Sequence, residues 1–141
     1  MTNSNEVMGY QADIGYIDAS AVPLFSDFTP KDTTGIYPLW GSLVDENRPN
    51  ISRYPKPEIF PVIIYKVVYR ELIESVIDPN GWNEVYIKAS GPDIEIKING
   101  ITTAEFTEKE DIPSKGCICL QTHSGDPYEI WYKNILLNQL D

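Results

Sequence analysis

The segment Pro38–Arg48, PLWGSLVDENR, gathers the side chains best suited to bind a polar ring-shaped ligand. It places the indole of Trp40 close to two adjacent carboxylates, Asp45 and Glu46, and to the guanidinium of Arg48. An aromatic face can stack on the C–H groups of a sugar ring, and planar charged groups can form hydrogen bonds with its hydroxyls and a carbonyl. The alternative is a structural loop, in which Asp45 pairs with Arg48 and Trp40 fills the core. On residue types alone, the structural alternative is the better one.

The second candidate group lies near the end of the chain, in GCICLQTHSG. His123 is the only histidine, so a zinc site built from several histidines is excluded. With an ordinary pKa near 6.5 it suits a general base at neutral pH, although a single histidine at a strand end is more often structural. Gln121 shares its expected strand face. Cys117 and Cys119 share this face as well and are predicted to be small buried residues, in poor geometry for a disulfide.

These groups must be positioned by β-strands, because most of the chain alternates between apolar and polar residues. In Asp93–Ile98 three isoleucines alternate with Asp, Glu and Lys, and Asn99-Gly100 then suits a type I′ hairpin turn. The C-terminal part is predicted to be an antiparallel meander. Its expected strands are Glu84–Ala89, Asp93–Ile98, Ile101–Phe106, Cys117–Thr122 and Glu129–Leu137.

The N-terminal half is less regular. Val7–Gly15 is expected to be a strand with Gln11 and Asp13 on one face and Tyr10, Ala12 and Ile14 on the other. The Pro- and Gly-containing stretch Tyr16–Tyr37 predicts a long loop. Val62–Asp78 begins with β-branched residues and ends with helical spacing, which predicts a strand followed by a short helix over Lys66–Val76.

Composition limits the class of partner. With Lys+Arg 11 and Asp+Glu 21 the formal charge is −10, which disfavours nucleic acid and anionic membranes. No apolar run reaches the roughly 20 residues of a membrane helix. The first ten residues, MTNSNEVMGY, lack the features of a signal peptide, so localisation stays open.

Six segments resemble one known family, in the same order. They are EVMGYQADIG, YPLWGSLVDENR, GWNEVYIKASG, the strand ending in ING, GCICLQTHSG and EIWYKNILL. This pattern is similar to the 3-keto-disaccharide hydrolase domain family, a concanavalin A-like, laminin-G-like jelly roll whose members are often periplasmic or secreted. The resemblance implies an all-β antiparallel jelly-roll sandwich with one short helix. The expected domain is residues 1–141, the C-terminal two-thirds of the family domain, incomplete because the family's N-terminal strands have no counterpart before Glu6.

The resemblance also implies a reaction: cleavage of a glycosidic bond next to a 3-keto sugar. A base removes the proton at C2, the C3 oxygen becomes an enolate, the substituent at C1 leaves and water adds. His123 or Asp13 could be the base, Arg48 could stabilise the enolate, and Glu46 or Asp45 could be the acid. The residues implied for substrate binding are Trp40, Asp45, Gln11 and Gln121.

No cofactor is predicted for this reaction. A divalent cation could replace Arg48 as the electrophile, with Asp13, Asp45 or Glu46 as ligands, but no spacing argues for it. The expected partner is a carbohydrate. Two other functions stay open: a non-catalytic carbohydrate-binding module with Trp40, Trp82 or Trp131 as a stacking platform, and an assembly domain that forms homo-oligomers through an open sheet edge.

Overall fold

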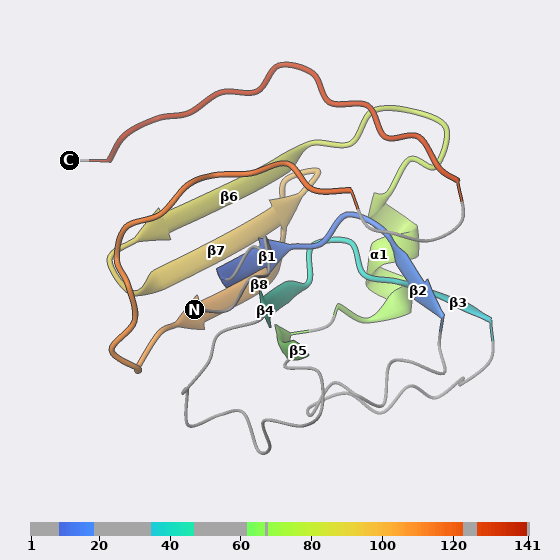
Figure 1. Cartoon of the computed structure of the whole chain (residues 1–141). Helices are drawn as coiled ribbons and strands as arrows, with labels where there is room; N and C mark the ends of the chain where they lie inside the picture. Colours follow the sequence, from blue (N-terminus) through green and yellow to red (C-terminus); the bar gives the residue numbers. More distant parts are fainter. Residues whose placement is uncertain (1–8, 19–34, 47–61, 67, 123–126, 141) are drawn as a thin grey trace. The chain divides into compact units, whose positions relative to one another are not determined.

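A computed structural model of the chain describes residues 9–18, 35–46, 62–66, 68–122 and 127–140 (Figure 1). For Glu46 and residues 62–66 only the backbone is described. The chain divides into two compact units, Met1–Glu110 and Asp111–Asp141. Every strand and helix of the described residues lies in the first unit.

The described residues of the first unit form two three-stranded antiparallel sheets and one short ribbon. The first sheet has the order β1-β4-β5, from β1 (Gly9–Ala12), β4 (Leu43–Glu46) and β5 (Val62–Lys66). A two-stranded ribbon joins β2 (Tyr16–Asp18) to β3 (Ile36–Pro38). The second sheet has the order β6-β7-β8, from β6 (Val85–Ser90), β7 (Asp93–Ile98) and β8 (Ile101–Thr107). The predicted all-β class with one short helix is confirmed.

The β6-β7-β8 sheet follows the predicted pattern closely. The turn between β7 and β8 has positive φ at both central residues, 48° at Asn99 and 81° at Gly100, as a type I′ turn requires. The side chain of Asn99 also donates to the carbonyl of Val76 at 2.7 Å and accepts from the amide of Glu84 at 2.8 Å. This turn therefore closes the hairpin and ties it to the chain that enters β6.

The core lies between the two three-stranded sheets. Leu43 of β4, Ile96 of β7 and Ala104 of β8 are almost completely buried and form one cluster. Tyr10 and Ala12 of β1 pack against this cluster. Because alternate residues of a strand share a face, the isoleucines of β7 that the sequence placed on one side supply the second sheet's half of the core.

The helix α1 (Arg70–Val76) follows β5, as predicted, but it begins four residues later than expected. Tyr69, the residue before the helix, is extended, with φ −61° and ψ 136°. The guanidinium of Arg70 lies over the ring of Tyr37 at 5.2 Å and donates to the carbonyl of Ile36. These contacts hold α1 against β3.

No helix in the described part of the chain is long and apolar enough to cross a membrane.

Two expectations for the N-terminal half need correction. Tyr16–Tyr37 was predicted to be a loop, but β2 and β3 lie at its two ends and pair with each other; residues 19–34 between them lie outside the described residues. The loop expected within Pro38–Arg48 is limited to the turn Leu39–Ser42, because Leu43–Glu46 is the central strand of the first sheet; the alternative pairing of Asp45 with Arg48 lies outside the described residues. These strands are only three or four residues long, too short to show alternation, and form through long-range pairing.

The C-terminal strands are also absent from the structure as described. Residues 117–122 and 129–137 belong to no strand, although their alternation predicts two. Cys117 and Cys119 are exposed rather than buried. Alternation supplies the tendency to form a strand, but a strand also needs a partner for its backbone hydrogen bonds.

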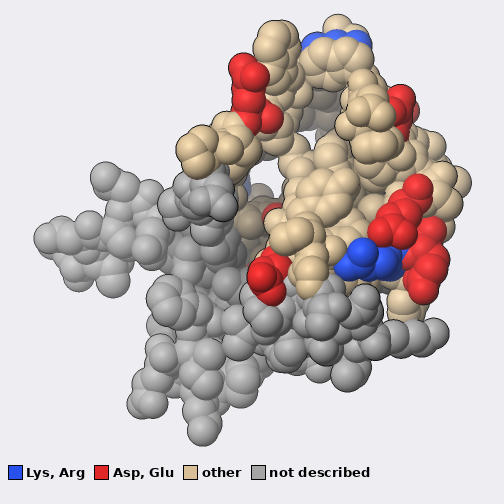
Figure 2. Space-filling model, turned by 90° about the vertical axis from the view of Figure 1, so that its right-hand side faces the viewer, with Lys and Arg blue, Asp and Glu red and all other residues tan. Residues whose placement is uncertain are grey.

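On the face in Figure 2, Asp and Glu side chains lie in several separate places, which agrees with a solvated acidic surface.

Candidate functional site

The candidate site is built around the turn Leu39–Ser42, which connects β3 to β4. Its backbone is tied to the segment that connects β1 to β2. The amide of Leu39 donates to the carbonyl of Gly15 at 2.8 Å, and the amide of Gly41 donates to the carbonyl of Asp13 at 2.8 Å. The amide of Asp13 donates in return to the carbonyl of Ser42 at 3.0 Å. Asp13 is therefore fixed beside the turn that carries Trp40.

Gly41 brings this turn into close contact with the second sheet. Its φ is +72°, which favours glycine. A Cβ at this position would lie 2.3 Å from Thr103 Oγ1 and 2.8 Å from Ile98 Cγ1. Thr103 is buried and donates its hydroxyl to the carbonyl of Ile96, so it has little freedom to move away. The turn is thus held rigidly over β7 and β8.

Two polar atoms of this turn are buried without a hydrogen-bond partner among the described residues. They are Trp40 Nε1 and Ser42 Oγ. Ser42 is completely buried. Buried donors are nearly always satisfied by protein, water or ligand. The turn therefore holds a buried indole N–H and a buried hydroxyl, which an ordered water could satisfy.

Asp45 lies on the core side of β4, away from Gln11. In the register of β1 and β4, Tyr10 is opposite Asp45, and Gln11 is opposite Val44. Residues directly opposite share a side of the sheet, so Asp45 shares the side of Tyr10 and Gln11 lies on the other side. Asp45 is completely buried. The two residues predicted to bind one substrate thus lie on different faces.

The other predicted residues are not brought to this turn by the described part of the structure. Glu46 is paired with Gly9 in the sheet, and only its backbone is described. Arg48 and His123 lie outside the described residues. Gln121 is exposed in the second unit, in a stretch without strand. Asp13, Trp40 and the unpredicted Ser42 are therefore the candidates that the structure places together.

Sequence reasoning missed a buried carboxylate at Glu108, directly after β8. Glu108 is 9% exposed, and its carboxylate accepts from the amides of Lys109 and Glu110, both at 2.8 Å. It also accepts a hydrogen bond from the hydroxyl of Tyr10. A charged residue after a strand is normally solvated, so no sequence signal marks Glu108 as buried. The contact joins β1 to the end of β8.

Tyr37 supports the other end of the site turn. It is buried, and its hydroxyl donates to the carbonyl of Val68 at 3.0 Å. Burial raises the pKa of Tyr37, an effect partly offset by Arg70. The hydroxyl is therefore neutral at physiological pH.

Among the described residues no group of three or more His, Cys, Asp or Glu is placed to hold a metal ion.

Comparison with known proteins gives the family. Residues 2–138 match the family model described as 3-keto-alpha-glucoside-1,2-lyase-like domain. The chain belongs to this family. No curated protein and no solved structure matches the chain. Family membership indicates a glycan-related function and agrees with the all-β, jelly-roll type of fold.

Proposed function

We propose that this domain binds a glycoside of a 3-keto sugar and cleaves its glycosidic bond by abstracting the proton at C2. Two observations support the proposal. The family model matches residues 2–138, and the turn Leu39–Ser42 holds an aromatic residue, two buried donors and the backbone of Asp13 in one place. The second observation concerns this chain's own residues and carries the proposal.

The chemistry needs four contributions. A ketone at C3 acidifies the C2 proton, which a base removes; the candidates for the base are Asp13 and His123. The electron pair moves to the C3 oxygen, where Arg48 is the proposed cation that stabilises the enolate. The enolate then expels the C1 oxygen, which an acid protonates, with Glu46 in this role because Asp45 is completely buried on the core side of β4. Water added across the resulting double bond gives the free keto sugar.

Substrate binding is assigned to the turn and its surroundings. Trp40 offers an indole for the sugar ring. Ser42 and Asp45 are both completely buried, which favours positions behind the contact surface. Gln11 and Gln121 are the further proposed contacts. The domain is proposed to occupy residues 1–141 as one unit of function.

The test is turnover of a 3-keto-disaccharide by the full chain, followed by release of the keto sugar, with and without added divalent metal. Arg48→Ala and His123→Ala are expected to lower the rate by about 10²–10³ with little change in melting temperature. Asp13→Asn is expected to lower it as well, while the matched variant Asp18→Asn on β2 should not. Absence of turnover at every pH and metal tested overturns the enzymatic proposal. Sugar-dependent tryptophan fluorescence without product would identify a binding module instead.

A second candidate function, self-association through a sheet edge, is favoured by β6. β6 is an edge strand of its sheet, every residue in it is exposed, and Lys88 is its only charged residue. An antiparallel pair of β6 strands centred on Ile87 would set Val85 opposite Ala89 of the second copy. It would also set Tyr86 opposite Lys88, a favourable cation–π pair. Edges with so little charge are prone to pair.

Sedimentation equilibrium at high micromolar concentration tests this second candidate. A dimer is expected, and Ile87→Lys should abolish it because two lysines would then oppose each other. Ile101→Lys changes an exposed isoleucine of β8 and is the matched control, which should leave the dimer intact. A strict monomer overturns the candidate.

A further inference from the structure

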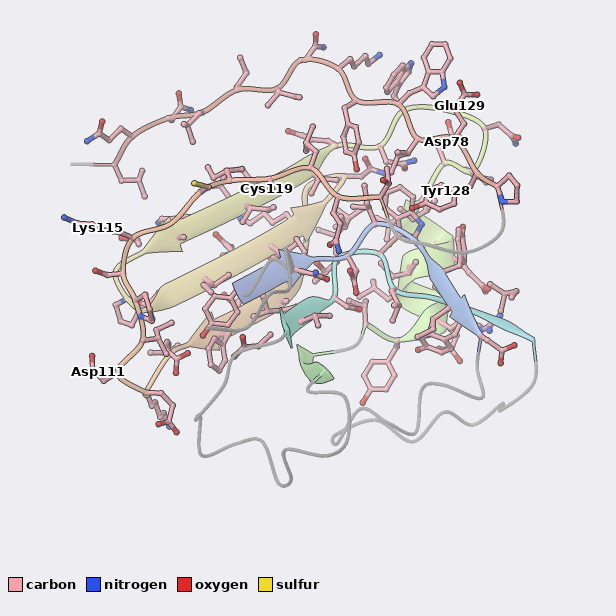
Figure 3. The ribbon with its side chains drawn as sticks, in the orientation of Figure 1. Asp78, Asp111, Lys115, Cys119, Tyr128 and Glu129 are labelled. Atoms are coloured by element: carbon pink, nitrogen blue, oxygen red, sulfur yellow. The ribbon has the colours of Figure 1, made fainter. Side chains whose placement is uncertain are left out.

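The exposure of both cysteines has a chemical consequence. Cys117 and Cys119 are free thiols with exposed side chains. Residues 115–122 form no helix, strand, turn or bend, and Figure 3 shows Cys119 on an extended run of the ribbon. Ile118, between the two cysteines, is 80% exposed. The pair thus offers two soft donor atoms to solvent on one short extended segment.

We propose that Cys117 and Cys119 form a two-coordinate site for a soft monovalent metal ion such as Cu(I). In an extended chain, side chains at positions i and i+2 project to the same side. Deprotonation of both thiols gives two thiolates that face one ion. The site is independent of the proposed glycoside chemistry.

The spacing favours a bridging ion over a disulfide. Residues i and i+2 of an extended chain have Cα atoms about 6.6–6.8 Å apart. A disulfide usually joins Cα atoms about 4.4–6.8 Å apart, most often about 5.5–6 Å, and requires its sulfurs to approach to about 2.05 Å. Two metal–sulfur bonds of the length found for zinc, about 2.3 Å, span up to about 4.6 Å. A bridging ion therefore needs a smaller approach of the two sulfurs than a disulfide, for which this spacing lies at the upper end of the range.

The number of donors selects the kind of ion. Thiolates are soft ligands that favour Cu(I) and Zn²⁺ over hard cations. Structural zinc takes four protein ligands, and no cluster of three or more His, Cys, Asp or Glu exists among the described residues. Two thiolates complete a linear Cu(I) centre, whereas they supply only half of a zinc site. The chemistry of the pair thus points to the monovalent ion.

The exposure of the segment also makes the site accessible. Neither thiol has to leave an apolar core to bind, and the residue between them points into solvent. Serine at either position should therefore be tolerated, since an exposed substitution usually changes stability by less than about 0.5 kcal/mol. Variants can consequently report on metal binding without a loss of fold.

The test is an anaerobic titration of the reduced full chain with Cu(I), buffered by a chromophoric Cu(I) chelator. One Cu(I) per chain is expected, with a sulfur-to-copper charge-transfer band in the ultraviolet. Cys117→Ser and Cys119→Ser should each weaken binding by about 10²–10⁴-fold, because the second thiolate binds at high effective concentration. Ile118→Ala is the matched control and should keep the wild-type affinity. Circular dichroism should be the same for all variants.

Three results would overturn the proposal. Wild-type Cu(I) affinity in either serine variant would show that one thiol is dispensable. One Cu(I) per two chains would show that the ion bridges separate molecules. Zn²⁺ binding as tight as Cu(I) binding would show that further ligands complete the site and that more than the two thiolates hold the ion.

Discussion

The two three-stranded sheets of the first unit are assembled in different ways. β6, β7 and β8 are consecutive in the chain and are joined by tight turns, so each strand pairs with its immediate neighbour. In the other sheet β4 lies between β1 and β5 and pairs with strands from distant parts of the chain. The candidate site lies on the second kind of sheet. Local connections make a regular scaffold, and long-range pairing brings site residues together.

The two sheets also differ in how their faces are used. Ile96 and Ile98 on one face of β7 are completely buried, while β6 beside it is exposed along its length. In the first sheet both Val44 and Asp45 are buried, although they point to opposite sides of β4. A strand buried on both faces has little room for change, so we expect the site sheet to tolerate fewer substitutions than β6.

The largest expected effect concerns the core that the sheets share. Ile96→Ala and Leu43→Ala should each cost about 2–5 kcal/mol of unfolding free energy, because each leaves a cavity between the sheets. Their double variant should deviate from additivity, since the two residues belong to one cluster. Urea denaturation measures all three, with the exposed Ile87→Ala as a control that should be nearly neutral. Strict additivity would mean that the sheets have separate cores.

The next effect concerns the point where the site turn meets β8. Gly41→Ala should lower the unfolding free energy for two reasons. A residue with a side chain at this positive φ costs about 1–2 kcal/mol, and overpacking against Thr103 costs about 1–3 kcal/mol. Gly100→Ala is the matched control, because it also has positive φ (81°) but nothing within 4 Å of a new Cβ. Denaturation curves should show Gly41→Ala as clearly the more destabilised. Equal losses would mean that the turn yields and that the site is not rigidly held.

A smaller effect is expected at the second link between the sheets. Glu108→Gln keeps one carbonyl acceptor but replaces the other oxygen with an amide donor. Either the hydroxyl of Tyr10 or the amides of Lys109 and Glu110 then lose an acceptor. We expect a cost of about 1–3 kcal/mol. Tyr10→Phe removes only the hydroxyl, and the double variant should cost less than the sum. Additive costs would show that the hydroxyl and carboxylate do not depend on each other.

The smallest effect is expected in the ribbon of β2 and β3. Tyr37→Phe removes one buried hydrogen bond to Val68 and should cost about 0.5–1.5 kcal/mol at neutral pH. Because burial raises the pKa of Tyr37, the folded state holds this proton more tightly than the unfolded state. Its contribution is therefore complete below pH about 10 and is lost as the pH rises through the raised pKa.

The pH dependence is measured as the difference in stability between wild type and Tyr37→Phe. Tyr132 also has a raised pKa, from burial and from Tyr128, and it is present in both proteins, so it cancels in the difference. The difference should shrink above pH about 10. A difference that stays constant through this range would contradict the assigned direction for Tyr37.

Local pattern and turn chemistry were enough to predict β6, β7 and β8. Asp93–Ile98 was predicted with the bounds it has in the structure, and Asn99-Gly100 adopts the positive φ angles that its residues favour. The order of strand and helix in residues 62–76 followed from β-branched residues before helical spacing. The six ordered segments indicated the family that the comparison confirms. All of these signals are carried by residues close together in the chain.

Tertiary structure alone decided what surrounds the candidate site. The sequence predicted Asp13, Trp40 and Asp45 as site residues, but only the pairing of distant strands fixed Asp13 beside the turn of Trp40 and turned Asp45 inward. Ser42 and Glu108 carried no local signal, because burial of a polar side chain depends on what packs over it. Alternation at residues 117–122 likewise predicted which side chains would share a strand face, but it could not predict a neighbouring strand. The backbone hydrogen bonds of a strand are made with another part of the chain.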